Sequence, residues 1–178
     1  MILIVGEAFG KEEHKMGRPF VGKCGTYLRR FINETGLAEQ VRYTNICNFW
    51  PNKDLKTRRP TKSEIEKGAT LVYKHIEETR PSLIIGLGQV ALSGLMYPGL
   101  KLTDNRGIRR VLGYAGAPED RPGYLAFTYH PSYALRFNKK AAMEEDLLNF
   151  FNQYKEERQW QSKPNSKHLR AELPRHYC

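Results

Sequence analysis

Residues 2–10 read ILIVGEAFG, an apolar run that ends abruptly at a glycine and a glutamate. Consecutive β-branched and leucine side chains favour a short buried strand, and Gly6-Glu7 is the turn signal that ends it. Three further runs of this kind follow, at Val41 to Cys47, Leu83 to Leu87 and Tyr124 to Tyr129. The sequence therefore predicts four short strands spread along the chain.

Stretches with helical spacing lie between these runs. An apolar stripe between residues 27 and 32 predicts a helix that ends at Gly36, and Thr61 followed by Glu64 is a capping-box pattern. A last helix is expected over residues 139–157. Strands that alternate with helices favour a parallel sheet covered on both faces. The expected fold is α/β: three layers, α/β/α, around a central, mostly parallel four-stranded sheet.

The length and charge of the chain suit a single DNA-binding domain. Its 178 residues fit one domain over 1–157, followed by a basic C-terminal tail or docked extension over 158–178. A net charge of +10 and a pI of about 9.6 point toward polyanionic partners, although many basic proteins bind no nucleic acid.

Several other classes of protein find no support in the sequence. No signal peptide and no membrane-length apolar run is apparent, which predicts a cytoplasmic protein without a membrane partner. Cys24, Cys47 and Cys178 are scattered, so reduced thiols and no metal are expected. There is no P-loop or zinc-protease motif, and residues 86–88 are interpreted as a tight strand-to-helix turn.

Unusual polar residues sit at or after the ends of the predicted strands. Glu7 follows the first strand, Asn45 lies in the second and His130 follows the fourth. Ligands of open α/β sheets bind beyond the carboxyl ends of the strands. These three distant segments are therefore expected to meet in one crevice.

Four short motifs occur in a set order: GEAFG at 6–10, GRPFVG at 17–22, Thr44-Asn45, and His130-Pro131-Ser132. In this order and spacing, from about Met1 to Asp146, the sequence resembles the uracil-DNA glycosylase superfamily, nearest to family 4 and its phage-type relatives. The resemblance implies a monofunctional glycosylase that hydrolyses the N-glycosidic bond of a flipped-out pyrimidine, uracil first, and leaves an abasic site. The implied partner is single- or double-stranded DNA, bound by a monomer.

The chemistry explains why such residues are needed. Cleavage builds positive charge on the sugar and negative charge on the departing base. His130 would donate a hydrogen bond to the base O2, and Glu7 would place or deprotonate the attacking water. The resemblance assigns Phe20 to stacking on the flipped base, while Asn45 can pair with the O4 and N3–H edge of uracil.

Other residues are assigned to the base pocket or to the DNA. Ala8, Phe9 and Gly10 form the loop that touches base and sugar. Glu13 either limits what enters beside C5 or belongs to a solvated charge run. By resemblance, the residues after His130 enter the minor groove, with a leucine wedge beside an arginine. The expected DNA contacts are Ser132, Tyr133, Leu135 and Arg136, with Lys53, Arg58 and Arg59 on phosphates unless they form a merely solvated basic loop.

The sequence departs from family 4 at two points. That family holds an iron–sulfur cluster on four cysteines; two would precede Met1, and the others would fall near Phe49 and Gly68, where no thiol exists. No cofactor is therefore expected. In addition, Phe9 replaces the usual proline of the first motif, and Gly10 places no side chain where other uracil enzymes block thymine.

These departures leave alternatives open. One is a glycosylase for a modified pyrimidine, such as the hypermodified bases of phage DNA, in antiviral defence. Another is a non-catalytic DNA-binding or polymerase-accessory module on the same fold. The combination of Glu7, Asn45 and His130 argues against a scaffold, which has no need of all three. Covalent trapping of the product is disfavoured because residues 53–59 contain no histidine.

Overall fold

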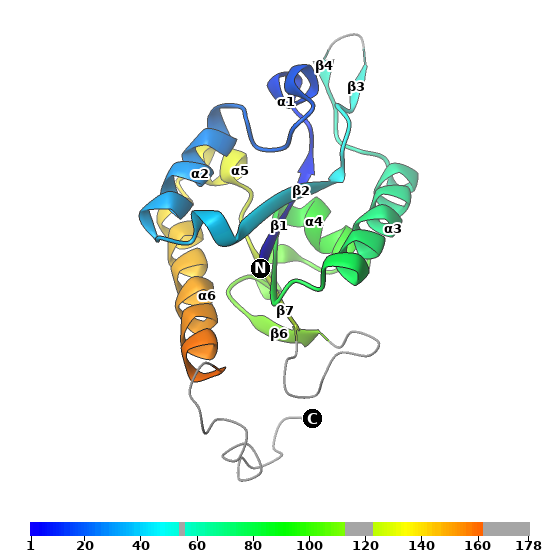
Figure 1. Ribbon diagram of the computed structural model, residues 1–178. Helices are drawn as coiled ribbons and strands as arrows, with labels where there is room; N and C mark the ends of the chain where they lie inside the picture. Colours follow the sequence, from blue (N-terminus) through cyan, green and yellow to red (C-terminus); the bar gives the residue numbers. More distant parts are fainter. Residues whose placement is uncertain (54–55, 113–122, 162–178) are drawn as a thin grey trace.

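The computed structural model describes residues 1–53, 56–112 and 123–161 (Figure 1). In chain order the elements are β1 (Ile2–Ala8), α1 (Lys11–Met16), α2 (Lys23–Glu34), η1 (Ala38–Gln40), β2 (Val41–Cys47), β3 (Asn52–Lys53), β4 (Lys56–Thr57), α3 (Lys62–Thr79), β5 (Leu83–Leu87), α4 (Gly88–Leu95), η2 (Leu102–Asp104), β6 (Arg109–Leu112), β7 (Gly123–Thr128), α5 (Pro131–Arg136) and α6 (Lys140–Gln161). The α/β class expected from the sequence is confirmed.

The central sheet has five strands in the order β2-β1-β5-β7-β6. The first four are parallel, whereas β6 runs antiparallel to β7 at the edge. The expectation of four strands was therefore one short. The missed strand reads Arg-Arg-Val-Leu and has no fully buried residue, so it lacks the apolar run by which the other strands are recognised. A separate two-stranded hairpin joins β3 to β4.

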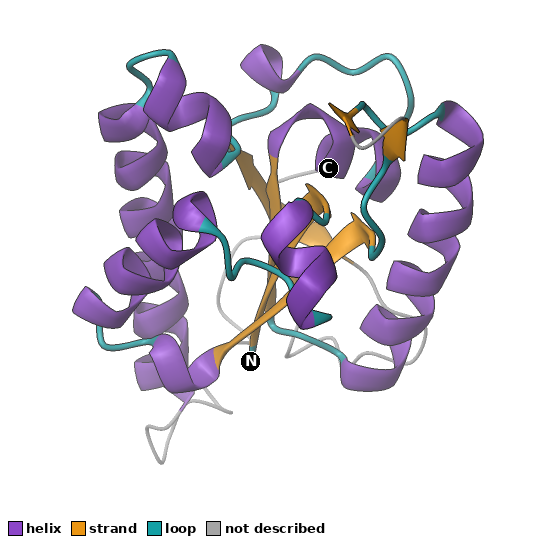
Figure 2. Cartoon of the chain, turned by 90° about the horizontal axis from the view of Figure 1, so that it is seen from above, coloured by secondary structure: helices purple, strands orange, loops and turns teal. Residues whose placement is uncertain are grey.

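Helices cover both faces of the sheet, as expected for three layers (Figures 1 and 2). Successive side chains of a strand point to opposite faces, and β1 shows this directly. Ile2 and Ile4 join one core cluster, beneath α2 and α6, while Leu3 and Val5 join the other, beneath α3 and α4. Because both faces of β1 are covered, its residues from Ile2 to Val5 are all fully buried.

The helix signals read from the sequence are confirmed with one shift in length. Gly36 follows α2 with φ 75°, and Thr61 and Glu64 form the capping box of α3. The last helix continues to Gln161, so the first four residues of the expected tail, 158–161, are helical. The remainder of that tail lies outside the described residues.

A buried network fixes the end of β7, directly before His130. Thr128 Oγ1 donates to Asp146 Oδ2 at 2.6 Å, and Arg106 donates to both oxygens of the same carboxylate. Asp146 belongs to α6, so this contact ties the carboxyl end of the strand to the helix that covers it. It thereby sets the position from which the His130 loop departs.

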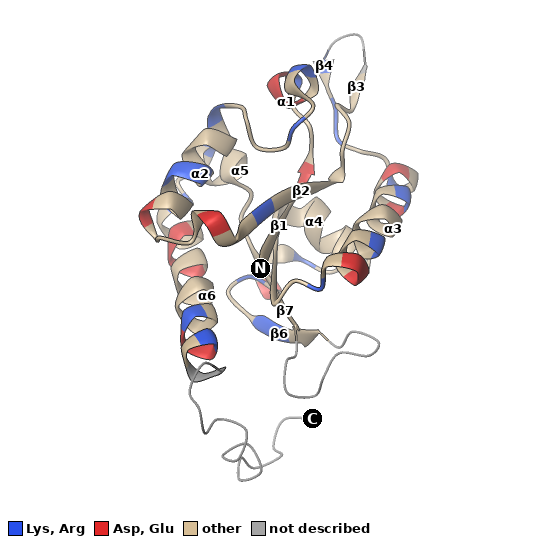
Figure 3. Ribbon diagram, in the orientation of Figure 1, with Lys and Arg blue, Asp and Glu red and all other residues tan. Residues whose placement is uncertain are grey.

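Basic side chains are distributed over many elements of the described chain. Figure 3 shows lysine and arginine spread over several helices, over the strands β2 and β6 and along the segment that follows β4. No helix in the described ranges is both long enough and apolar enough to cross a bilayer.

Candidate active site

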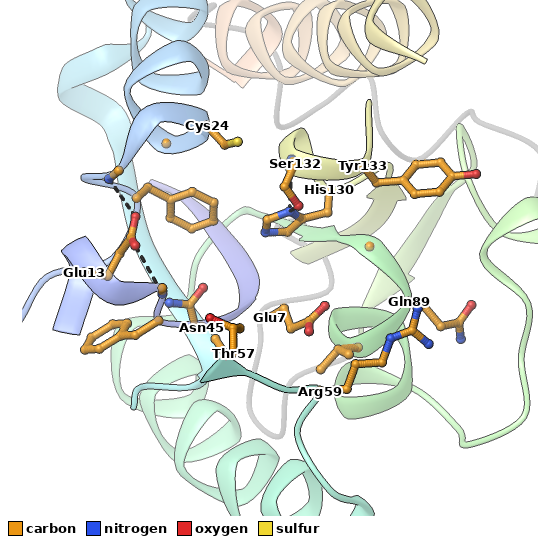
Figure 4. A pocket seen from close by; sticks show the side chains of 18 of the residues that line it. Glu7, Glu13, Cys24, Asn45, Thr57, Arg59, Gln89, His130, Ser132 and Tyr133 are labelled. Carbon is orange, nitrogen blue, oxygen red and sulfur yellow. Dashed lines mark hydrogen bonds between the residues drawn. The ribbon is translucent and has the colours of Figure 1, made fainter. Parts of the chain in front are cut away.

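A cavity of about 1100 Å³ opens at the carboxyl edge of the parallel strands. Its wall combines the end of β1, the loop between α1 and α2, β2, the start of α4 and the loop after β7 (Figure 4). The expected convergence of the distant motifs is confirmed, because Glu7, Phe20, Asn45 and His130 all line it. The first and last of them, Glu7 and His130, are more than 100 residues apart in the chain.

Glu13 ties the first two motifs together. Its carboxylate accepts hydrogen bonds from the backbone N–H groups of Gly10 at 3.1 Å, Val21 at 3.1 Å and Gly22 at 2.7 Å (Figure 4). The side chain is half-buried and engaged on both oxygens. The interpretation of Glu13 as part of a solvated charge run is therefore wrong, because this one member of the run faces inward and holds the loop beside the pocket.

Removal of the Glu13 charge is expected to destabilise the fold. Glu13→Gln puts an amide NH₂ against backbone donors, and hydrogen bonds to a charged group each contribute about 1.5–3 kcal/mol. We expect a loss of about 2–4 kcal/mol in the free energy of unfolding, measured by urea denaturation. Glu12→Gln is the matched control, because Glu12 is exposed and only 3.6 Å from the exposed Lys15. That control should change stability by less than about 0.5 kcal/mol.

Phe20 and Asn45 approach one another across Gly6. A Cβ atom on Gly6 would lie 2.3 Å from Asn45 Oδ1 and 2.6 Å from Phe20 Cζ. Phe20 itself has φ 56°, and Arg29 Nε donates to its carbonyl oxygen at 2.9 Å. Because Gly6 has no side chain, the Phe20 ring and the Asn45 amide can both occupy this corner of the pocket.

Alanine at position 6 should damage this corner selectively. Gly6→Ala forces Asn45 or Phe20 aside, and overpacking of this kind costs about 1–3 kcal/mol. We expect a lower Tm together with a loss of base binding. Gly99→Ala serves as control, because Gly99 has φ 94° and open space around it. Its backbone strain should lower Tm while base binding stays intact; equal binding losses in both variants would refute the assignment.

Asn45 presents an amide without a protein partner. Its residue is 2% exposed, and its backbone N–H donates to Asn48 Oδ1 at 3.2 Å. None of the hydrogen bonds formed by the described residues uses its side-chain oxygen or nitrogen. A nearly buried amide that has no partner is costly unless a ligand pairs with it. The Asn45 amide thus offers a hydrogen-bond donor and an acceptor to a ligand in the cavity.

The geometry around His130 fixes its tautomer. His130 is the N-cap of α5, and its Nδ1 accepts the backbone N–H of Ser132 at 3.2 Å. The Ser132 hydroxyl lies 2.8 Å from the same nitrogen. An atom that accepts an N–H bond carries no proton, so a neutral imidazole must carry its hydrogen on Nε2. Ser132, expected to contact DNA, here orients the histidine.

His130 is also neutral under ordinary conditions. Burial lowers its pKa from 6.5 to about 4, and the nearby Arg136 acts in the same direction. The Phe20 ring lies parallel to it within 27°, with 6.3 Å between the ring centroids. The site therefore holds a neutral N–H donor beside an aromatic face.

Glu7 lies in the last part of β1, and its side chain projects into the same space as those of Asn45 and His130 (Figure 4). Burial raises the pKa of its carboxyl group, and the positive charge of Arg59 partly offsets that rise. Arg58 and Arg59 both line the cavity. The two terminal nitrogens of Arg58 donate hydrogen bonds to the Glu64 carboxylate, at 2.8 and 2.7 Å. DNA contact by either arginine stays a prediction, and the Lys53 side chain lies outside the described residues.

The rim of the cavity is formed by α5. Tyr133 and Leu135 are 42% and 39% exposed, and Arg136 Nε donates to the Ser132 carbonyl at 2.9 Å. Phe137, which the motif analysis missed, is 56% exposed directly after this helix. Its position four residues after Tyr133 is a helical-face signal that could have revealed it.

Two other lining residues were also missed. Gln89 fixes the segment around Leu100 and Leu102 at the far wall of the cavity. Its side-chain amide donates to the Leu100 carbonyl at 2.7 Å and accepts from the Leu102 N–H at 3.0 Å. Cys24 is a free thiol at the pocket wall. Neither residue stands in a pattern that distinguishes it from any other residue near a helix start.

The arrangement defines a class of protein: an α/β domain whose carboxyl-edge pocket combines an aromatic face, an unpaired amide, a neutral imidazole donor and a carboxylate. Residues 1–157 match the model of the Uracil DNA glycosylase superfamily. The chain therefore belongs to that superfamily.

Similar curated proteins carry a more specific name. The chain is 34% identical over 135 residues to the type-4 uracil-DNA glycosylase of Thermotoga maritima, covering 76% of this chain and 66% of that protein. It is 30% identical to the type-4 enzyme of Pyrobaculum aerophilum, over 84% of this chain and 76% of that protein. For the type-4 enzyme of Saccharolobus solfataricus the identity is 34%, over 82% and 68%. The chain thus spans about two thirds to three quarters of these relatives.

The residues at the expected cluster positions do not fit an iron–sulfur cluster. A Cβ atom on Gly68 would lie 2.0 Å from the Ile46 carbonyl oxygen, so a cysteine does not fit there without a backbone shift. Among the described residues the only cysteines are Cys24 and Cys47, and no group of metal-binding side chains occurs there. The absence of an iron–sulfur cluster stays a prediction, and an iron assay of the purified protein checks it.

Proposed function

We propose that the chain is a hydrolytic, monofunctional DNA glycosylase that excises uracil and leaves an abasic site. The observation that carries the proposal is that Phe20, Asn45 and His130 meet around one cavity, where they bring together an aromatic ring, an amide and an imidazole. The type-4 names of the relatives support uracil as the base.

Each side chain has a role in the proposed reaction. Phe20 stacks on the flipped base, and the Asn45 amide donates to O4 and accepts from N3–H. Nε2 of neutral His130 donates to O2 as negative charge develops on the departing base. Glu7, with its raised pKa and no ion-pair partner among the described residues, places the attacking water and offsets the charge on the sugar.

A direct experiment tests the proposal. The protein is incubated with an oligonucleotide that holds one uracil, and alkali then cleaves any abasic site. Strand cleavage at the uracil is the expected result, with cytosine and thymine left in place. An intact strand at high enzyme concentration would contradict the proposed activity. Excision at the wild-type rate by preparations of both His130→Ala and Asn45→Leu would point to a contaminating glycosylase.

A modified pyrimidine is the second candidate substrate. The cavity of about 1100 Å³ continues past the base-reading corner to Gln89, Leu102 and Thr103, which leaves room beyond a single ring. Gly10 adds no side chain to that wall. Mass spectrometry of bases released from modified phage DNA separates the two candidates, since a uracil enzyme releases nothing from DNA that lacks uracil.

A further inference from the structure

A row of three aromatic side chains leads out of the cavity along α5. Tyr133 and Phe137 are four residues apart at α5 and its C-cap, so they lie on one side of that helix, and Tyr129 precedes the helix in the loop after β7. The ring centroids are 5.5 Å apart for Tyr129 and Tyr133 and 4.7 Å apart for Tyr133 and Phe137. We call these three residues the aromatic ladder.

Exposure increases along the ladder away from the core. Tyr129 packs against the core cluster and lines the cavity together with Tyr133, while Tyr133 is 42% and Phe137 56% exposed. Tyr133 and Phe137 therefore leave much of their apolar surface in water, although they contact each other. Aromatic rings exposed beside a pocket are typical of a surface that a partner covers.

Positive charge accompanies the ladder at both ends. The Arg106 guanidinium lies 5.0 Å from the Tyr129 ring centroid, and that of Arg136 lies 5.8 Å from the Phe137 ring. Arg106 is held by the Asp146 carboxylate, so Arg136 is the arginine of the two that a phosphate can meet. Aromatic rings beside such a cation suit single-stranded nucleic acid, whose bases stack on the rings. A paired duplex buries the faces of its bases and offers no such surface.

We propose that the aromatic ladder binds unpaired nucleotides of the strand whose base enters the cavity, so that the protein favours single-stranded over duplex DNA. The inference rests on the proposed function, because the cavity at the foot of the ladder must hold a nucleotide of that strand. Tyr129 and Tyr133 line both the cavity and the ladder, and thus connect the two surfaces.

The test measures binding of uracil-free DNA, which requires no excision. Fluorescence anisotropy gives Kd for a single-stranded oligonucleotide and for its duplex, with the wild-type chain, Phe137→Ala, Phe137→Trp and Tyr97→Ala. Loss of one stacked base is expected to weaken single-strand binding of Phe137→Ala by about 5- to 150-fold. Phe137→Trp keeps a ring and should bind like the wild type. Tyr97 is 72% exposed and does not line the cavity, so Tyr97→Ala should bind normally.

Two further comparisons separate stacking from charge. The duplex Kd of Phe137→Ala should change much less than its single-strand Kd. Stacking releases no counterions, so the factor by which Phe137→Ala weakens single-strand binding should be the same at low and high salt. Arg136→Gln removes a phosphate contact and should make the Kd for DNA depend less steeply on salt concentration.

Several outcomes would overturn the ladder. They are unchanged single-strand binding in Phe137→Ala, an equal loss on duplex, an equal loss in Tyr97→Ala, or a dimer that Phe137→Ala dissociates. The two proposals fail separately. A chain that binds single strands through Phe137 but excises no uracil contradicts only the proposed activity, and a chain that excises uracil yet is indifferent to Phe137→Ala contradicts only the ladder.

Discussion

Replacement of His130 by alanine is expected to slow uracil excision by roughly 10²- to 10³-fold at saturating enzyme, because one preorganised donor to the departing base is lost. Single-turnover kinetics measures the chemical step and separates it from product release. His130 is held by its contact with Ser132, so its Nε2 hydrogen is already directed when the base arrives. The loss should appear in the rate constant and only weakly in the Kd for DNA.

The control for this substitution is His75→Ala. His75 is an exposed residue of α3, outside the cavity wall, and its loss should leave the excision rate unchanged. His130→Gln retains an N–H donor and should recover part of the rate lost in the alanine variant. Rates within threefold of wild type in His130→Ala would remove the histidine from the chemistry.

The pH dependence of the His130 reaction follows from its lowered pKa. With a pKa of about 4, His130 stays neutral from pH 5 to 8, so no titration of this group should appear in that range of the rate profile. In the unfolded chain the pKa lies near 6.5, so the unfolded state binds more protons between pH 4 and 6.5. The His130 contribution to stability is therefore complete above pH 6.5 and is lost as the pH falls toward 4.

The fold and the centre of the site could be predicted from sequence because both depend on local patterns. Apolar runs marked four parallel strands, and the carboxyl-edge rule then placed Glu7, Asn45 and His130 together. Edge strand β6 was missed because Arg109 and Arg110 interrupt the apolar pattern, and of its apolar residues only Leu112, itself partly buried, packs against the core.

The contacts that the sequence could not reveal depend on where individual side chains point in the folded protein. Glu13 looks like its charged neighbours until the structure turns its carboxylate toward three backbone N–H groups. Ser132 was expected only to contact DNA, which stays a prediction, and the structure shows in addition that its hydroxyl lies beside His130 Nδ1. In both cases the residue type is ordinary, and only the fold determines which partner lies within hydrogen-bond distance.

Loss of the Asn45 amide should slow uracil excision by up to a larger factor than loss of the His130 imidazole. Asn45→Leu keeps the branched shape of the side chain but leaves O4 and N3–H of a bound uracil without partners. Two unsatisfied groups cost about 2–6 kcal/mol, so excision should fall by roughly 30- to 20,000-fold. Because the amide has no partner among the described residues, the same change should leave Tm unchanged or raised. Asn152→Leu, on an exposed face of α6, is the control that should excise uracil normally.

An aspartate at position 45 tests the reading of the base edge itself. The position is 2% exposed, and burial raises the pKa of a carboxyl group, so the acid form is favoured there. A protonated carboxyl can donate to N3 of cytosine and accept from its N4–H₂, a pair that the wild-type amide, as oriented for uracil, leaves mismatched. Asn45→Asp should therefore release cytosine, and more at low pH than at high pH. Cytosine that stays in place in this variant at every pH, while uracil is still excised, would show that the base edge is read elsewhere in the pocket.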